Sequence, residues 1–385
     1  MIRVVLWDYI GDAEKNVGKF LKPNVKIIRT LRPNDADQAE VIMRGDWDYV
    51  LIFEKDTRKI FEEILSTIRA MNVDTENIIF AQDTSAWLEN PAAIYSLIDF
   101  DKGGLLYRWV NLLNQRKWHD YSTCTVEGIS YVATSKDDYV ISQMYLKGKN
   151  HAEDEMKTFH ALAKKYYNVD DSAGYFLDLG ANIGTTGIYF TKKIAPNLKL
   201  LAFEPDPENF KLLHANLILN DMINKAIAVN YGLGEYFDEK IMYRDLKNPG
   251  HNNVTEPKND VPTEKIEIIP LDAYLDEMQI AAQEVKYIWI DTEGFEPQVL
   301  LGAKNLLREN PTPVFMEFNP TAWNKSGFFE RMVDLLKAAG YTHWIHIPTF
   351  TGGNETLFPI DELLGCKDLS YNIGETGDIF LVRNF

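Results

Sequence analysis

One stretch, residues 175–209, limits the possible folds more than any other part of the sequence. It opens with an apolar run at 175–179, continues through a turn that contains Gly180, and reaches a second apolar run at 198–203 that Glu204 follows directly. Short apolar runs of this kind predict buried strands, and the residues between them have the length of a helix. A strand, a glycine-containing turn, a helix and a second strand form a unit that binds nucleotide-like ligands at the carboxyl edge of its sheet.

The residues of the turn narrow the choice of ligand. A dinucleotide fingerprint requires Gly-x-Gly-x-x-Gly, in which the second glycine lets a pyrophosphate approach the helix. Here the glycines are Gly180 and Gly184, and Asn182 stands where the second glycine is required. Asp178 adds negative charge nearby, whereas Glu204 can accept hydrogen bonds from both hydroxyls of a ribose. Although the two glycines alone also suit an ordinary tight turn, together with both acids they favour a nucleoside cofactor with a cationic amino acid group, such as S-adenosylmethionine.

Three carboxylates follow a third apolar run, which spans residues 285–290. Asp291, Glu293 and Glu296 come directly after this expected strand. Open α/β sheets bind ligands at that edge, so an acid at the tip of a buried strand is a candidate for chemistry. Glu296 is explained equally well as a favourable charge at the start of the next helix, and Glu293 is open to either interpretation. Asp291 is therefore the strongest catalytic candidate of the three.

Composition and charge limit the partners and the location. A chain of 385 residues is expected to form two domains, or one domain with a large extension. Its net charge of −17 argues against a nucleic-acid partner, because phosphate binding needs a basic face. No apolar stretch approaches the roughly 20 residues of a membrane helix, and the acidic N-terminus is unlike a signal peptide. Cys124 and Cys366 have no metal-ligand spacing and suit a reducing compartment. We therefore expect a cytoplasmic protein with no membrane partner.

The first domain is expected at residues 1–115. Its expected strands are residues 2–8, 25–30, 49–53 and 77–81, and its expected helix is residues 58–71. This alternation predicts a small open α/β domain with a mostly parallel sheet. Because only a lone glycine, Gly11, follows the first strand, a structural or substrate-presenting role is favoured over a degenerate nucleotide site.

Residues 116–385 are expected to form the second domain, with 116–174 as a connecting strand and helix. The same alternation of strands and helices continues to its end, which again predicts an α/β fold. The expected strands are residues 128–134, 175–179, 198–203, 226–231, 240–243, 266–270, 285–290, 314–318, 341–347 and 378–383. The expected helices are residues 152–167, 271–278, 296–309 and 328–339, one that starts near Thr185, and one that Asp206 caps.

From about residue 150 to the end, the sequence resembles the FkbM-type S-adenosylmethionine-dependent methyltransferases. The motifs that carry this resemblance are FLDLGANIG (176–184), AFEPDPENF (202–210), IPLDAYL (269–275), IDTEGFEPQVLLGAKNLL (290–307) and MEFNP (316–320). They occur in the order and spacing of the family. The acidic motif is more usually Asp-Val-Glu-Gly, so Thr292 is a minor departure. Residues 1–115 lie outside the resemblance.

The resemblance implies a Rossmann-like, seven-stranded class I methyltransferase sheet with helices on both faces and an antiparallel last strand. It implies S-adenosylmethionine as the cofactor and O-methylation of a hydroxyl on a sugar, glycan or glycosylated metabolite. The expected partner is thus a small-molecule or glycan acceptor, and a homo-oligomer is compatible with the sequence. Two alternatives remain: a nicotinamide-dependent oxidoreductase, which Asn182 opposes, and a non-catalytic binding protein on this fold, which the intact acids oppose.

Roles can be assigned to the candidate residues on this basis. The residues expected to bind the cofactor are Asp178, Gly180, Ala181, Asn182, Gly184, Glu204 and Asn230. Asp291 is the first candidate for the base that takes the acceptor's proton, and Glu293 is the second. Glu317 and His251 follow them. A divalent ion held by Asp291, Glu293 and Glu317 is conceivable, but no metal is expected.

Overall fold

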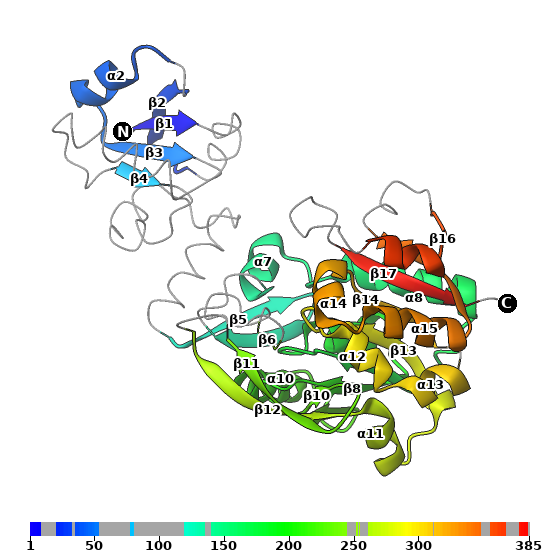
Figure 1. Cartoon of the computed structure of the whole chain (residues 1–385). Helices are drawn as coiled ribbons and strands as arrows, with labels where there is room; N and C mark the ends of the chain where they lie inside the picture. The colour runs from blue at the N-terminus through cyan, green and yellow to red at the C-terminus, as the bar shows by residue number, and fades with distance from the viewer. Residues whose placement is uncertain are drawn as a thin grey trace. The chain divides into compact units, whose positions relative to one another are not determined.

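The computed structural model divides into two compact units, Met1–Asp120 and Tyr121–Phe385 (Figure 1). The sequence placed the boundary five residues earlier, after residue 115. The structure describes residues 1–8, 21–32, 35–53, 78–80, 119–134, 140–244, 252, 254, 261–310, 312–347, 355–366 and 377–383. The expected helix at 58–71 and the candidate His251 lie outside the described residues.

The first unit contains a parallel sheet in its described part. The strand order is β2-β1-β3-β4, and all three pairings are parallel. The elements are β1 (Ile2–Asp8), β2 (Val25–Leu31), α2 (Gln38–Arg44), β3 (Tyr49–Phe53) and β4 (Ile78–Phe80). Residues 4–7 of β1 and 50–52 of β3 are buried, which is why both segments read as short apolar runs in the sequence.

The second unit is built on a large mixed sheet in the order β16-β15-β17-β14-β13-β7-β8-β9. Its strands are β7 (Tyr175–Leu179), β8 (Lys199–Phe203), β9 (Ala226–Val229), β13 (Val285–Ile290), β14 (Val314–Glu317), β15 (Tyr341–His346), β16 (Phe358–Pro359) and β17 (Asp378–Arg383). The final strand β17 pairs antiparallel with both of its neighbours, as expected. The sheet has eight strands rather than the expected seven, because the two-residue β16 adds to β15 at the edge.

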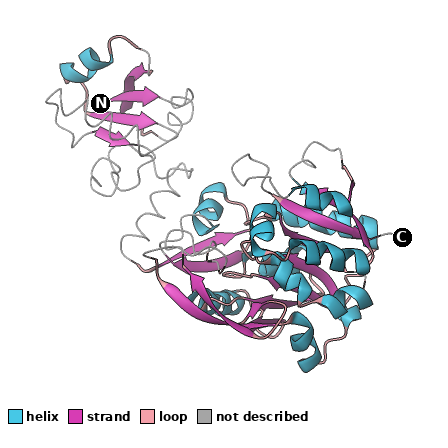
Figure 2. Ribbon diagram, viewed as in Figure 1, coloured by secondary structure: helices cyan, strands magenta, loops and turns pink. Residues whose placement is uncertain are grey.

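Helices cover both faces of this sheet (Figure 2), and successive strand residues alternate between the two faces. In β7, Leu177 and Leu179 belong to one apolar cluster, whereas Phe176 belongs to the other. The first cluster includes residues of α12 (Glu296–Leu301), α13 (Lys304–Glu309) and α15 (Phe329–Ala338); the second includes residues of α8 (Glu153–Tyr167) and α10 (Pro207–Leu219). The alternation places Asp178 on the second face, under the helix that follows β7.

Two helical segments differ from the sequence prediction. The helix expected at 296–309 is two helices, α12 and α13, which are separated where the backbone of Gly302 packs against Gly234. A Cβ at Gly302 would lie 2.0 Å from the carbonyl oxygen of Gly234. The helix after β7 is α9 (Thr185–Tyr189), which continues as a π-helical turn over Phe190–Ile194. The helices that the sequence analysis did not predict include α2, α7 (Val140–Lys147) and α14 (Pro320–Ser326).

A hairpin opens the second unit and is held by side chains of α10. It consists of β5 (Tyr121–Val126) and β6 (Ile129–Thr134), joined at a turn with positive φ at both central residues. Asn216 accepts from the backbone N–H of Val132 at 2.7 Å and donates to its carbonyl at 3.1 Å. Asn220, the residue that follows α10, makes the same pair of hydrogen bonds with Ser130, at 3.1 and 2.7 Å. The two side-chain amides thus satisfy backbone groups of β6 that a neighbouring strand would otherwise pair with.

A small second sheet lies between β9 and β13 in the chain. It consists of β10 (Gly232–Leu233), β12 (Thr263–Ile269) and β11 (Asp238–Tyr243), in the order β10-β12-β11. Strands β11 and β12 form an antiparallel hairpin. α11 (Leu271–Glu277) follows β12 directly and leads toward the main sheet again.

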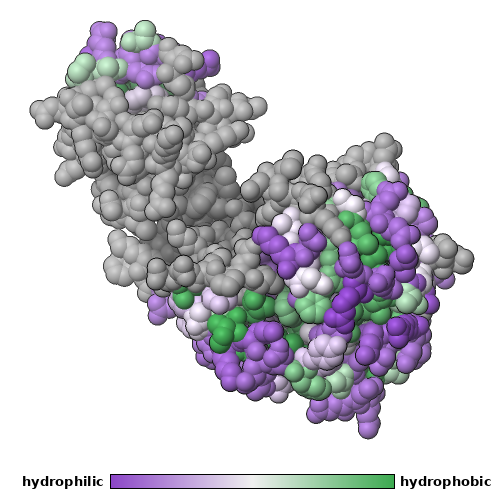
Figure 3. Space-filling view, in the orientation of Figure 1, coloured by the Kyte–Doolittle hydropathy of each residue, from purple (hydrophilic) through white to green (hydrophobic). Residues whose placement is uncertain are grey.

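The visible surface of the second unit is mostly hydrophilic (Figure 3). On the face of the second unit that Figure 3 shows, hydrophilic side chains cover most of the area and apolar side chains gather in only a few small places. None of the helices in the described part of the chain combines the length and the apolar character needed to span a bilayer.

Candidate functional site

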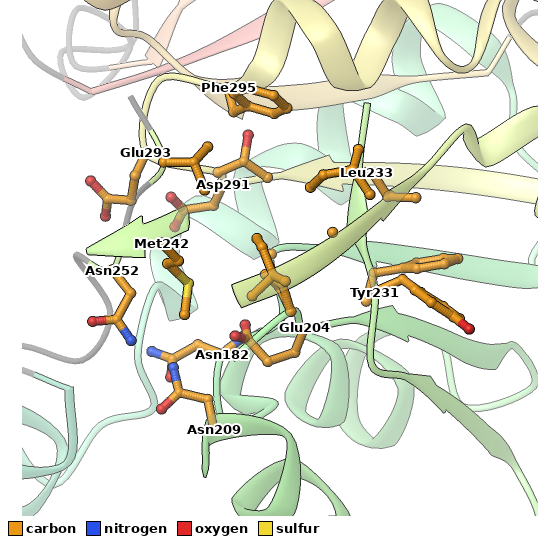
Figure 4. A pocket seen from close by; sticks show the side chains of 18 residues that line it. Asn182, Glu204, Asn209, Tyr231, Leu233, Met242, Asn252, Asp291, Glu293 and Phe295 are labelled. Atoms are coloured by element: carbon orange, nitrogen blue, oxygen red, sulfur yellow. The ribbon is translucent and has the colours of Figure 1, made fainter. Parts of the chain in front are cut away.

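A pocket lies at the carboxyl edge of the large sheet, where the chain leaves β7, β8, β9 and β13 (Figure 4). The loop after β13 forms one side of it, and the glycine-rich turn together with the tip of β8 forms the opposite side. The lining residues are Gly180, Asn182, Phe203, Glu204, Pro205, Asn209, Tyr231, Gly232, Leu233, Met242, Asn252, Val254, Ile266, Ile268, Asp291, Thr292, Glu293 and Phe295. An edge of this kind is where open α/β sheets bind their ligands.

The glycine-rich turn is held tightly between two neighbouring strands. The N–H groups of Gly180 and Ala181 both donate to the carbonyl oxygen of Phe203, at 3.1 and 2.8 Å. Gly180 has a φ of +95°, and a Cβ at this residue would lie 1.8 Å from the carbonyl oxygen of Asp291. Only glycine therefore fits where the turn after β7 meets the end of β13.

Replacing Gly180 with alanine is expected to lower the free energy of unfolding by roughly 4 kcal/mol or more, because a positive φ is combined with a backbone clash. Gly327 provides the matched control, since its φ is +75° and nothing lies within 4 Å of its Cβ position. Gly327→Ala is expected to cost only about 1–2 kcal/mol. Urea unfolding of the two variants measures both values, and equal losses would contradict the close approach of the two strands.

Asp178 lies beneath the turn and is almost completely buried. Its Oδ2 accepts a hydrogen bond of 2.8 Å from the N–H of Gly187, and a Cβ at Gly187 would lie 2.7 Å from the same oxygen. Burial, together with the charge of Asp291, raises the pKa of Asp178 to about 7. The contact fixes the start of α9, so the direct role of Asp178 in this structure is to hold the turn.

Glu204 lines the pocket at the tip of β8, where its two oxygens accept backbone hydrogen bonds. Its Oε2 accepts from the N–H of Asn182 and its Oε1 from the N–H of Asp206, both at 2.8 Å. Burial, assisted by the like charge of Asp206, raises the pKa of Glu204 to about 8. Asn182 itself has a φ of +49°, a conformation that asparagine tolerates better than most residues.

The loop after β13 carries the second set of acids. Asp291 is open to the pocket, and enclosure by the protein together with the charge of Glu296 raises its pKa to about 7. Glu293 also lines the pocket and has a φ of +53°. A non-glycine residue in this region is strained and persists only where the surroundings hold it.

Glu296 is the residue that holds this loop. It is fully buried, and its Oε1 accepts from the N–H and the hydroxyl of Thr292, both at 2.9 Å, and from the N–H of Gly294 at 3.2 Å. Its Oε2 accepts from the indole N–H of Trp323 at 2.6 Å. Glu296 therefore positions the loop that presents Asp291 and does not itself face the pocket.

Two further acids lie behind the loop. Glu317 at the end of β14 pairs with Asp378 at the start of β17. Burial raises the pKa of both carboxyls well above their usual range, and the charges of neighbouring acids act in the same direction. Within the described residues, no group of three or more His, Cys, Asp or Glu side chains is arranged to hold a metal ion.

The structure brings together five of the nine candidate residues around one pocket. Those that line it are Gly180, Asn182, Glu204, Asp291 and Glu293. Those that do not line it are Asp178, Ala181, Gly184 and Asn230. Asn230 instead donates to the carbonyl oxygens of Glu204 and Pro205, at 2.8 and 3.1 Å. The assigned roles stay predictions.

Several lining residues were not singled out by the sequence. Asn209 lies in the first turn of α10, within the AFEPDPENF motif, and Phe295 lies within the acidic motif. Asn209 follows Glu204 by five residues and Phe295 follows Asp291 by four, so their nearness in the sequence could have identified them as pocket residues. Met242, Ile266 and Ile268 come from the small sheet, and no local pattern connected that sheet with the pocket.

Comparisons with known proteins agree with this site. Residues 178–342 match the family model of the methyltransferase FkbM domain. The chain is 26% identical over 194 residues to methyltransferase sdnD of Sordaria araneosa, which is 43% of this chain and 73% of that protein. The matched family segment includes the glycine-rich turn, Glu204 and the acidic loop after β13.

Solved structures with similarity to the chain include two further methyltransferases. Methyltransferase FkbM from Methylobacillus flagellatus KT is 13% identical with a TM-score of 0.33, and the match covers 87% of this chain and 84% of that chain. An S-adenosylmethionine-dependent O-methyltransferase from Thermotoga maritima is 12% identical with a TM-score of 0.33, and the match covers 71% and 82% of the two chains.

Proposed function

Residues 178–342 of this chain belong to the FkbM methyltransferase family, and on that premise we propose that the protein is an S-adenosylmethionine-dependent O-methyltransferase. Its acceptor is a hydroxyl group on a sugar, a glycan or a glycosylated metabolite. One observation supports the proposal most: Glu204 at the tip of β8 and Asp291 after β13 face one pocket from opposite sides (Figure 4).

The residues of the pocket fit a cationic nucleoside cofactor. Glu204 would hold the ribose hydroxyls, because a carboxylate accepts hydrogen bonds from both. The Oδ1 of Asn182 is buried and has no hydrogen-bond donor among the described residues, which leaves it able to accept from a ligand N–H. A dinucleotide site needs a glycine at the position of Asn182, so that a pyrophosphate can approach the helix. The residues of the site therefore do not favour a nicotinamide dinucleotide.

S-adenosylmethionine, when bound, supplies a methyl group that its positively charged sulfur makes electrophilic. The protein must then bring the acceptor oxygen close to the methyl group and remove the hydroxyl proton. Asp291 is the proposed proton acceptor, because it is open to the pocket and its pKa lies near neutral pH. Glu296 and Trp323 keep the loop of Asp291 in place through the hydrogen bonds described above.

The charge of the pocket favours an acceptor without phosphate or carboxylate groups. Three carboxylates line it, those of Glu204, Asp291 and Glu293. Among the described residues, the lining contains no lysine, arginine or histidine that would neutralise an anion. An anionic group beside Asp291 would meet like charge, which costs free energy in an enclosed site. An uncharged sugar hydroxyl avoids that cost.

Isothermal titration calorimetry with S-adenosylhomocysteine tests the cofactor assignment. Binding in the micromolar range is expected, because the pocket combines hydrogen-bond acceptors with an apolar wall. NADH provides the control ligand and is expected not to bind. If millimolar S-adenosylhomocysteine gives no heat of binding, the proposal is wrong. A panel of uncharged sugars and glycans then identifies the acceptor through the release of S-adenosylhomocysteine from S-adenosylmethionine.

A further inference from the structure

A single buried carboxylate, that of Asp206, connects the floor of the pocket with the small sheet. Asp206 follows two residues after Glu204 and is 1% exposed. On the floor, its Oδ1 caps α10 by accepting from the N–H groups of Glu208 and Asn209, at 2.7 and 3.3 Å. Its own N–H donates to Glu204, as described above. The residue is therefore one hydrogen bond away from the proposed ribose-binding acid.

The same carboxylate also holds an arginine from the small sheet. Arg244 directly follows β11, and its Nε and Nη2 donate to the two oxygens of Asp206, at 2.8 and 2.9 Å. The N–H of Arg244 donates to the carbonyl of Pro262 at 2.9 Å, and its Nη2 lies 3.4 Å from Glu264 on β12. Asn252, which lines the pocket, donates to Asp206 at 3.0 Å. Arg244 thus ties both strands of the hairpin to the floor.

The hairpin that is tied down in this way forms an apolar wall of the pocket. Met242 of β11 and Ile266 and Ile268 of β12 are buried together, and Val254 packs against them. All four line the pocket. In Figure 4, Met242 lies between the side of the pocket that carries Asp291 and the side that carries Glu204. A displacement of the hairpin would therefore open the space that both ends of the proposed cofactor need.

The ion pair of Asp206 and Arg244 is well suited to hold the β11–β12 hairpin against the floor of the pocket. A bidentate arginine–carboxylate contact fixes orientation as well as distance, and few water molecules can compete for Asp206, whose side chain is 2% exposed. The side chain of Arg244 is 21% exposed. By contrast, the other cross-strand ion pair of the hairpin, Lys265–Glu239, is 62% and 59% exposed and contributes little.

We propose that Arg244 and Asp206 form a clasp that holds the β11–β12 hairpin over the cofactor, so that Arg244 is a positioning residue for cofactor binding. The inference rests on the proposed function, because it assumes that the pocket binds S-adenosylmethionine. Neither residue needs to touch the cofactor. The clasp acts through the apolar wall and through Asn252, which it keeps against the pocket.

Two substitutions separate the clasp from the helix cap. Arg244→Gln removes the arginine and leaves the cap of α10 intact. Asp206→Asn removes the charge of the clasp but keeps an oxygen for the cap, since asparagine is as good a cap as aspartate. Each is expected to raise the dissociation constant of S-adenosylhomocysteine roughly tenfold, the effect of about 1.4 kcal/mol. Arg244→Lys keeps the charge and is expected to restore part of the affinity.

The double variant and an exposed control sharpen the test. Because both single changes break the same contact, the double variant is expected to bind no more weakly than either one. Lys265→Ala breaks the exposed pair on the same hairpin and is expected to leave the dissociation constant unchanged. The KM for S-adenosylmethionine is expected to rise in the Arg244 variants while kcat changes less, which a general loss of folded enzyme would not produce.

The outcomes distinguish the inference from the proposed function. If the natural protein does not bind S-adenosylhomocysteine, the proposed function fails and the clasp with it. If the natural protein binds it and Arg244→Gln binds equally well, only the clasp is overturned. If Lys265→Ala weakens binding as much as Arg244→Gln, the hairpin responds to any change and the clasp is likewise overturned. Thermal unfolding of each variant confirms that folded protein is compared.

Discussion

Replacing Asp291 with asparagine is expected to lower kcat by about 10²- to 10⁴-fold, because the variant cannot accept the proton of the acceptor hydroxyl. Asparagine keeps the size of the side chain, and the loop stays attached to the buried Glu296. The affinity for S-adenosylhomocysteine is therefore expected to change little. Calorimetry gives that affinity, and the release of S-adenosylhomocysteine with the acceptor that the panel identifies gives kcat.

The pH dependence of the rate provides a second measurement of the same role. A general base works only when it is deprotonated, and enclosure by the protein together with the charge of Glu296 raises the pKa of Asp291 to about 7. The rate of the natural enzyme is thus expected to fall as the pH drops through about 7, and Asp291→Asn is expected to lose this step. Glu293→Gln is the matched variant. A large loss of kcat in Glu293→Gln and none in Asp291→Asn would show that Glu293, and not Asp291, is the general base.

Replacing Glu204 with glutamine is expected to raise the dissociation constant of S-adenosylhomocysteine by roughly 10- to 100-fold, because a hydrogen bond to a charged group contributes about 1.5–3 kcal/mol. Glutamine removes the charge that would accept from the ribose hydroxyls. Glu208→Gln is the control, since Glu208 lies in the first turn of α10 but pairs with Lys211 at the surface. Calorimetry at one pH compares the two variants.

Glu204 also predicts how the affinity depends on pH. Burial raises the pKa of Glu204 to about 8, so the empty site holds a proton that ribose hydroxyls would displace when they donate to the carboxylate. Affinity is therefore expected to increase as the pH rises from about 6.5 to about 8.5, and Glu204→Gln is expected to flatten this dependence. An affinity that decreases over that interval would contradict the ribose-binding role.

Most core strands of the second unit could be predicted from the sequence because they are buried on both faces. The segments Tyr175–Leu179, Val285–Ile290 and Asp378–Arg383 have the predicted bounds, since short, mostly apolar segments of this length are typical of central strands. The hairpin partner β5 was missed because one of its three buried residues is the polar Ser122, so its sequence shows only a weak apolar alternation. At the break between α12 and α13, Gly302 lies against Gly234, which is 68 residues away in the chain, and no local pattern announces this contact.

The candidate site was predictable where it follows strand tips. Glu204 and Asp291 each come directly after a buried strand, and parallel strands end at the same edge of a sheet. Asp178 shows the limit of this reasoning, because the alternation of side chains directs it under α9 and onto the N–H of Gly187. The contact between Asp206 and Arg244 joins residues 38 positions apart and depends on how the small sheet folds back.

Asn216 and Asn220, near the end of α10, connect the β5–β6 hairpin to the region that matches the family. The family match starts at residue 178, but Asn216 and Asn220 use their amides to complete the backbone of β6. Asn216 also donates to the carbonyl of Ile183, inside the glycine-rich turn, at 2.8 Å. A chain cut at the family boundary would remove the β6 partners of both amides, while Asn216 would keep its hydrogen bond to Ile183. A chain that starts at Tyr121, the first residue of the second compact unit, keeps these hydrogen bonds and is expected to be more stable than one that starts at residue 178.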